Sequence, residues 1–436
     1  MKIFAILTAA LLAAVPAVHA QDIVEVRSDG GLTAWLVEEP SIPIVAIEIS
    51  VRGGASIDPD GQEGVARLTM GLLDEGAGAL DATAFSQAEE SLGVSLSFGS
   101  GRDHATISAR MLSENREESL ALLRTALMEP RFDEEAIERV RGQILSRIRS
   151  DAADPNSLAG QAYRTMAFPD HPYGRPTDGT LESVAALTRE DVVAAHRALL
   201  VRDRLFIGVV GDISADEVGP MLDALLGDLP TGGPDLPAEV SPILDGGIEV
   251  VSFATPQSVA LFGQPGIARD DADFYAAFVM NHILGGGGFS SRLTEEVREK
   301  RGLTYGVGSY LVNYEQSDVY LGTVASANGR IAEAVEVIAE EWRRMAEEGV
   351  SAEDLEKAKR FLTGAYPLRF DSNASIARIL VGVQEAGLPI TYPVERNSLI
   401  EAVTLEDVNR VAAELLQPDA LTFVVVGQPE GLPATN

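Results

Sequence analysis

The chain has 436 residues, with 66 acidic against 34 basic side chains and no cysteine. Its formal net charge of -32 argues against a nucleic-acid-binding protein, because such proteins carry lysine and arginine patches. Without cysteine, neither disulfides nor thiolate metal sites can form. The acidity favours a solubilising surface, although affinity for basic peptides is an open alternative.

The N-terminus predicts export. Residues Met1–Ala20 contain one lysine, an apolar run and a small-residue ending, which is typical of a cleaved secretory signal peptide. We expect the mature chain to begin near Gln21 and to reside in a bacterial periplasm. An uncleaved membrane anchor is the alternative. No later stretch reaches the roughly 20 apolar residues that a membrane helix needs, so we expect no membrane span in the mature chain.

An internal repeat sets the predicted architecture. Leu187–Gly211 aligns without a gap with Val403–Gly427, and the matched pairs include Asp191 with Asp407 and Leu199 with Leu415. A mature chain of about 416 residues also exceeds the size at which single cores stop growing. The sequence therefore predicts two related halves.

Each copy of the repeat predicts one helix followed by one strand. Thr188 and Thr404 are predicted N-caps, each with an aspartate three residues later, and apolar residues then recur at helical spacing. A continuous apolar run follows each helix, as expected for a buried strand. The two predicted strands are Leu205–Val210 and Leu421–Val426.

A segment rich in proline and glycine, Gly227–Gly247, separates the copies and is predicted to be a linker. In each half, strands come first, amphipathic helices follow, and the repeated helix and strand close the unit. The opening strands are predicted at Ile44–Val51 and Ile248–Gly263. The predicted domains are 21–228 and 248–436, joined by 229–247.

The sharpest motif lies in the second half. Four glycines, Gly285, Gly286, Gly287 and Gly288, precede Phe289. Ser290 or Ser291 can then cap a helix that Gly302 ends, after which Leu303–Val307 is predicted as a strand. The glycines either permit a tight helix entry or let the backbone lie close to an extended peptide.

This duplicated chain resembles the pitrilysin or insulinase metallopeptidases, particularly the short, processing-peptidase-like branch, over nearly its whole mature length. The resemblance implies an α+β clamshell, in which each half is a mostly antiparallel sheet covered by helices. It also implies that Arg298 and Tyr305, seven residues apart, hold the substrate backbone and hydrogen-bond the scissile carbonyl oxygen. A phenol O–H and a guanidinium suit those roles. The glycine loop and Phe289 would contact the peptide.

The zinc motif of that family is missing. The family carries H-x-x-E-H on an early helix and a further glutamate on a later one. Here Arg67 and Gly71 stand at the histidine positions, Met70 stands at the glutamate position, and Arg147 falls close to the distal glutamate. None of these is a usual zinc ligand.

The histidines that follow the predicted signal peptide offer no replacement motif. None has a histidine or carboxylate partner at the helical spacing of a metal site, although a site assembled from distant residues is left open. These histidines are His104, His171, His196 and His282.

The sequence thus predicts the zinc-free subunit of a heterodimeric zinc peptidase. A sister subunit bearing H-x-x-E-H would bring the zinc, this chain would bring Arg298 and Tyr305, and an extended or unfolded peptide would be the substrate. No cofactor is expected in this chain. Two alternatives are a non-enzymatic peptide-binding or scaffold protein of the same fold, and a self-sufficient protease with an unrecognised metal site.

Overall fold

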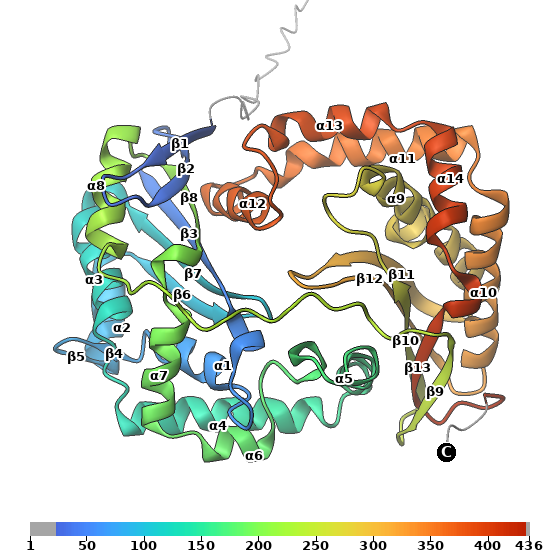
Figure 1. Cartoon of the computed structure of the whole chain (residues 1–436), viewed down its shortest axis with the longest axis horizontal. Helices are drawn as coiled ribbons and strands as arrows, with labels where there is room; N and C mark the ends of the chain where they lie inside the picture. Colours follow the sequence, from blue (N-terminus) through green and yellow to red (C-terminus); the bar gives the residue numbers. More distant parts are fainter. Residues whose placement is uncertain (1–22, 433–436) are drawn as a thin grey trace, which may run out of the picture.

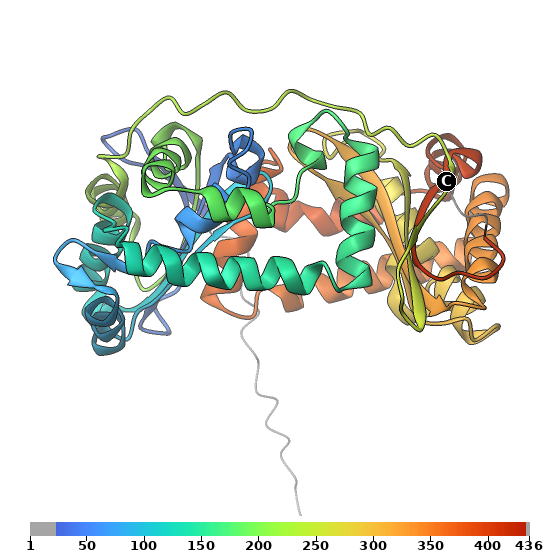
Figure 2. The same cartoon turned by 90° about the horizontal axis from the view of Figure 1, so that it is seen from below.

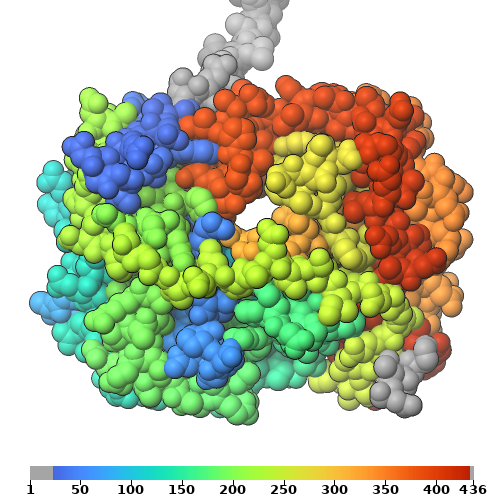
Figure 3. Space-filling view, in the orientation of Figure 1, coloured from blue at the N-terminus to red at the C-terminus, as the bar shows by residue number. Residues whose placement is uncertain are grey.

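The computed structural model describes residues 23–432, so the predicted signal peptide Met1–Ala20 and the predicted mature start Gln21 lie outside the described residues. Two α+β halves sit side by side around a central opening (Figures 1 and 3). Each half is a sheet covered by helices, which confirms the predicted fold class. In the described part of the chain, no helix is long and apolar enough to cross a membrane.

The first half is built on a six-stranded sheet of order β1-β2-β8-β3-β7-β6, in which only the β2–β8 pair is parallel. Its strands are β1 (Ile23–Arg27), β2 (Thr33–Glu38), β3 (Ile44–Arg52), β6 (Ser95–Ser100), β7 (His104–Leu112) and β8 (Leu205–Gly211). A small hairpin, β4 (Gly76–Ala77) and β5 (Leu80–Asp81), lies outside it. The helices are α1 (Val65–Met70), α2 (Ala82–Leu92), α3 (Arg116–Met128), α4 (Glu134–Asp151), α5 (Pro155–Ala167), α6 (Leu181–Ala186), α7 (Arg189–Leu199) and α8 (Ala215–Leu226).

The second half repeats this plan with a five-stranded sheet of order β11-β12-β10-β13-β9, in which only β13–β9 is parallel. Its strands are β9 (Gly247–Ser252), β10 (Gln257–Pro265), β11 (Thr304–Asn313), β12 (Asp318–Ala327) and β13 (Thr422–Gly427). Its helices are α9 (Phe274–Asn281), α10 (Ile331–Glu348), α11 (Ala352–Ala365), α12 (Asn373–Glu385), α13 (Tyr392–Ala402) and α14 (Leu405–Leu415).

The repeated units form as predicted. In α7 the Thr188 hydroxyl accepts the Asp191 backbone N–H at 3.2 Å, and in α14 Thr404 accepts that of Asp407 at 3.1 Å. Both aspartates return a bond to the cap backbone, which completes two capping boxes. β8 and β13 lie inside their sheets, which explains their unbroken apolar sequence.

The two halves exchange helices, which the sequence did not predict. One helix of each half packs on the sheet of the other half. α5 of the first half packs on β10 and β13 of the second, and α12 of the second packs on β3 and β8 of the first. The contact under α12 includes buried Trp35, Val210 and Leu380, and the contact under α5 includes buried Tyr163 and Val424. Each sheet therefore has its inner face covered by the other half.

Glycines in the two sheets make room for the exchanged helices. A Cβ on Gly208 of β8 would stand 2.6 Å from the Ala377 carbonyl oxygen of α12, and a Cβ on Gly263 of β10 would collide with the Tyr163 hydroxyl of α5. Gln384 of α12 also bonds the backbone of Ile207, donating to its carbonyl at 3.0 Å. The close approach of helix and strand thus depends on the missing side chains.

The predicted linker has no helix or strand between Gly227 and Gly246, and it runs across one face of the molecule from half to half (Figure 2). Backbone hydrogen bonds hold the linker against both halves, and Arg202 N–H donates to the Pro230 carbonyl at 2.9 Å near its start. Val240 N–H donates to the Gln316 carbonyl at 2.8 Å, and Ile243 N–H donates to the Ala167 carbonyl at 2.9 Å. It therefore lies against both the β11–β12 turn and the end of α5.

A polar latch at the β11–β12 turn joins the halves a second time. Glu315 from the second half meets Arg52, whose Nε donates at 2.8 Å, and His104, whose Nε2 lies 3.0 Å from the carboxylate. The Glu315 backbone N–H donates to Asp103 at 3.2 Å. Glu385 of α12 lies 3.8 Å from the other ring nitrogen of His104.

Replacement of Gly208 by alanine tests the helix exchange. We expect Gly208→Ala to lower the free energy of unfolding by about 1–3 kcal/mol, because its Cβ would overpack the contact with α12. Gly142→Ala is the matched control. Gly142 is exposed in α4 with nothing within 4 Å of an added Cβ, so alanine there should be neutral or stabilise by up to about 1 kcal/mol. Urea denaturation measures both, and equal stability of the two variants would contradict the exchange.

The latch predicts a pH dependence of stability. Burial alone would lower the pKa of His104, but Glu315, Glu385 and Asp103 outweigh burial and raise it above the usual 6.5. A raised pKa means that the charged form stabilises the fold. That stabilisation is complete below the unfolded-state pKa and is lost as the pH rises through the folded-state pKa. The stability gap between wild type and His104→Gln should therefore shrink from pH 5.5 to pH 9.

His171→Gln is the control, because burial lowers the pKa of His171. The stability that neutral His171 contributes is present above the unfolded-state pKa and is lost as the pH falls. The difference in stability between wild type and His171→Gln should therefore grow as the pH rises. Urea midpoints at three pH values measure both gaps. A gap for His104→Gln that does not change with pH would show that the latch does not titrate as described.

Candidate functional site

The glycine-rich segment continues from α9. A π-helical turn, His282–Gly286, and a 3-10 turn, Gly288–Ser290, lead out of the helix. Gly285 is buried, and a Cβ there would collide with the Ser309 hydroxyl, so packing alone accounts for a glycine at this position, and its contact with peptide stays a prediction. The three following glycines lie at or near the surface.

The helix after the glycine loop has the predicted boundaries. The Ser291 hydroxyl accepts the Thr294 backbone N–H at 3.3 Å, and the π-helical turns span Thr294–Glu299. Leu293 and Val297 are fully buried on its inner face. Gly302 has φ of 59°, the left-handed stop that was predicted, and β11 begins at Thr304.

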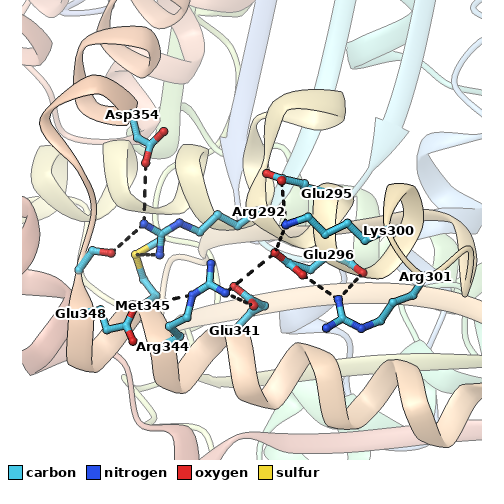
Figure 4. Close-up of polar contacts among 11 residues, drawn as sticks. Arg292, Glu295, Glu296, Lys300, Arg301, Glu341, Arg344, Met345, Glu348 and Asp354 are labelled. Atoms are coloured by element: carbon cyan, nitrogen blue, oxygen red, sulfur yellow. Dashed lines mark hydrogen bonds and ion pairs between the residues drawn. The ribbon is translucent and has the colours of Figure 1, made fainter.

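An ion-pair network holds this helix against α10 (Figure 4). Buried Glu296 accepts from Lys300 at 2.7 Å and from Arg301 at 2.7 Å, and Lys300 in particular lowers its pKa. Arg344 of α10 lies 3.9 Å from Glu296 and donates to Glu341 at 2.8 Å. Because Glu296 is buried and has several partners, the helix is held more firmly than an exposed pair could hold it.

Arg292 anchors the start of the same helix. Its guanidinium donates to the Gly349 carbonyl at 2.8 Å and lies 3.9 Å from Asp354, beyond the end of α10 (Figure 4). The network therefore fixes both ends of the helix, and neither of the two predicted substrate-binding side chains takes part in it.

Arg298 and Tyr305 face solvent instead. The Arg298 side chain is 32% exposed, its only nearby carboxylate within residues 23–432 is Glu299 at 3.5 Å, and its guanidinium lies 4.8 Å from the ring centre of Phe289. Tyr305 is 90% exposed and Phe289 is 79% exposed. The Arg298 guanidinium, the Tyr305 hydroxyl and the Phe289 ring are thus accessible to solvent. The N–H groups of Arg298 and the O–H group of Tyr305 are free to donate to a ligand.

The degenerate metal positions also come together. Arg67 of α1 and Arg147 of α4 lie on either side of one carboxylate, that of Asp178, at 3.8 and 3.0 Å. The Asp178 side chain is 20% exposed. Arg147, which falls close to the distal ligand position in the sequence, therefore lies near Arg67 in the fold.

These residues do not fit a zinc ion. Met70 is fully buried, and Gly71 ends α1 where a Cβ would stand 3.3 Å from Val140. Two guanidinium groups occupy the space beside Asp178, which would repel a cation. Among residues 23–432, no group of three or more histidine or acidic side chains could hold a metal ion.

The remaining histidines have other partners. His196 bonds the Leu127 carbonyl at 2.9 Å, His171 bonds the Ala238 carbonyl at 3.0 Å, and His282 stacks on Phe361 with ring centres 5.0 Å apart. His104 belongs to the latch described above. Burial lowers the pKa of His196 and of His282, which favours their neutral forms.

Comparison with known protein families shows to which family the chain belongs. Residues 34–181 match "Insulinase (Peptidase family M16)", and residues 186–362 match "Peptidase M16 inactive domain", so the two matches together span most of the chain. The chain belongs to the M16 peptidase family. The resemblance to insulinase-type peptidases that was drawn from the sequence is thereby confirmed.

Similar M16 proteins include ones that are named as inactive and ones that are named as proteases. The "non-peptidase homolog YmxG" of Helicobacter pylori is 28% identical, covering 89% of this chain and 90% of that protein. An "uncharacterized zinc protease" of Mycobacterium leprae is also 28% identical, covering 89% and 88%. The crystal structure of a "peptidase M16 inactive domain" from Pseudomonas fluorescens matches with a TM-score of 0.86 and 27% identity over 95% of this chain and 100% of that one.

Two parts of this M16 site were missed from the sequence. Asp178 sits in a turn between Pro176 and Gly179, and a single aspartate in a turn gives no signal of the two arginines that flank it. The Glu296 network was also missed, although the spacing of Glu296 and Lys300 is that of a helical ion pair. Its link to α10 depends on tertiary packing.

Proposed function

We propose that this chain is the zinc-free subunit of a heterodimeric M16 peptidase in the bacterial periplasm. A sister subunit carrying H-x-x-E-H would supply the zinc, and this chain would close the chamber and hold the peptide. The observation that carries the proposal is the contrast between the two sites. Arg67, Arg147 and Asp178 occupy the metal position, whereas Arg298 and Tyr305 are displayed with free donors.

The support beneath Arg298 favours a binding role over an incidental surface position. The network around buried Glu296 fixes a short π-helical segment that exposes one arginine at its outer side. Tyr305 follows at the first residues of β11, where the ladder with β12 is irregular between Thr304 and Val307. Such local irregularity is common where a strand presents a side chain to a ligand.

The chemistry that follows is electrostatic. The Tyr305 hydroxyl can donate to a peptide carbonyl oxygen and remain bonded as negative charge develops on it, and Arg298 can hold a neighbouring backbone carbonyl through two N–H groups. Phe289, 4.8 Å from the arginine, would pack against an apolar side chain of the peptide. Gly288, which has nothing within 4 Å of an added Cβ, would leave space for an extended backbone, whereas Gly286 and Gly287 lie close against Asn281 and His282.

Paired substitutions in the reconstituted heterodimer test the proposal. The chain is co-expressed with the H-x-x-E-H subunit from the same organism, and hydrolysis of a fluorogenic peptide is followed with zinc present. We expect Tyr305→Phe and Arg298→Ala each to lower kcat/KM by about tenfold or more, because each removes a hydrogen-bond donor from the substrate oxygen.

Two substitutions serve as matched controls. Tyr310→Phe alters another exposed tyrosine of β11, and Arg360→Ala alters an exposed arginine of α11, so both should keep wild-type turnover. Wild-type turnover in both Tyr305→Phe and Arg298→Ala would reject the assignment. It would favour the second candidate, a non-enzymatic scaffold, which agrees with the name "non-peptidase homolog" of the Helicobacter pylori relative.

A further inference from the structure

A pocket in the second half is lined by arginines that form no ion pair in the part of the chain that the structure describes. It measures about 640 Å³ and is lined by residues of α12, of α13, of the turn before α12 and of the loop before α9. The helices α12 and α13 lie on one side of the central opening (Figure 1). That volume is in the range of small-molecule sites. Its wall holds four arginines against one carboxylate, Asp371, in a protein where acids outnumber bases. The arginines are Arg269, Arg369, Arg378 and Arg396.

These arginines form no ion pair within the described residues, although Arg378 lies close enough to act on the Glu48 carboxylate. Within residues 23–432, none of the four has a carboxylate within 4.0 Å of its guanidinium nitrogens, although sixteen other arginines of the same residues do. Arg369 and Arg378 are exposed to solvent. The pocket wall thus carries more positive than negative charge.

Arg396 shows that the charge is built into the pocket. It is only 7% exposed, and its hydrogen bonds go to neutral groups, the Leu362 carbonyl at 3.0 Å and the Asn397 side chain at 3.1 Å. Its guanidinium also lies 4.4 Å from the Tyr366 ring centre. A buried cation without an anion is costly, which favours an arrangement completed by an anionic ligand.

Tyr366 provides an independent sign of a missing partner. It is 6% exposed, it lines the same pocket, and its buried hydroxyl has no hydrogen-bond partner among residues 23–432. An unsatisfied buried hydroxyl is uncommon in folded proteins and usually has a functional cause. The hydroxyl is therefore a donor that a ligand oxygen could use.

The rest of the wall is apolar or aromatic. Ile379, Val383 and Leu388 line it, and Tyr392 lies beside Arg269, with 5.3 Å between guanidinium and ring centre. Arginine forks match the geometry of carboxylate and phosphate oxygens. The wall therefore suits a molecule with an oxyanion at one end and an apolar body at the other.

We propose that this pocket binds a small organic anion, whose carboxylate or phosphate group is held by the arginines and by the Tyr366 hydroxyl, and whose apolar body packs on the aromatic and aliphatic wall. This site is separate from Arg298 and Tyr305. It needs no partner subunit, so it can be tested on the full chain alone, and its failure would leave the proposed function untouched.

Isothermal titration calorimetry with three probes tests the site. Benzoate carries a carboxylate, phenyl phosphate carries a phosphate, and benzamide is the uncharged counterpart. We expect saturable binding of at least one anion at low salt, weakening as salt is added, and no binding of benzamide. The stronger of the two anions identifies the head group. Absence of saturable binding for both anions, or equal binding of benzamide, would overturn the proposal.

Variants locate the binding. Arg369→Gln with Arg378→Gln removes two exposed charges and should weaken binding of the anion by about tenfold or more, since hydrogen bonds from a charged donor to an anion are stronger than neutral ones. Arg110→Gln with Arg360→Gln removes two exposed arginines elsewhere and should leave the affinity unchanged. Equal affinities in the two double variants would place the anion outside this pocket.

Tyr366→Phe separates binding from folding. Because the hydroxyl has no partner in the described chain, its removal should leave the unliganded urea midpoint unchanged or raise it, while it weakens the anion at least about fivefold. A lower urea midpoint with unchanged affinity would instead show that the hydroxyl serves the fold, and would contradict its role as a ligand donor.

Discussion

The reciprocal packing of α5 and α12 is the constraint on which the rest of the structure depends. Each sheet has one face covered by helices of its own half and the other face by a helix from the opposite half, so neither half has a complete core alone. Burial of apolar area at both exchanged contacts stabilises one relative position of the halves. The latch of Glu315 with Arg52 and His104 adds a polar contact to that position.

Because the two halves hold one position relative to each other, three regions of the chain form distinct charged arrangements. α1 and α4 meet around Asp178, which pairs with two arginines, so an ion cluster lies at the positions that the family resemblance assigns to the metal ligands. In the second half, the ion pairs of Glu296 anchor the helix that carries Arg298. Arg298 takes no part in these ion pairs, so its guanidinium can bind a ligand. The arginine pocket beside α12 exists because an exchanged helix and α13 face each other there.

The features predicted from the sequence are those that residues close together in the chain determine. Thr188 and Thr404 revealed the repeated helices because a capping box lies within four residues, and Gly302 revealed the end of the helix before β11. The helix exchange could not be predicted, since an amphipathic helix shows that it buries a face but not whose sheet it covers. The packing of Gly285 against Ser309 could not be predicted for the same reason, because that contact is tertiary.

The division of labour between two subunits is tested most directly by counting zinc. The purified full chain is incubated with excess zinc, desalted and assayed by elemental analysis and peptide hydrolysis, alone and after assembly with the H-x-x-E-H subunit. We predict well under one zinc and no hydrolysis for the isolated chain, and one zinc with hydrolysis for the pair. One tightly held zinc on the isolated chain, with peptide cleavage that zinc chelation abolishes, would contradict the account.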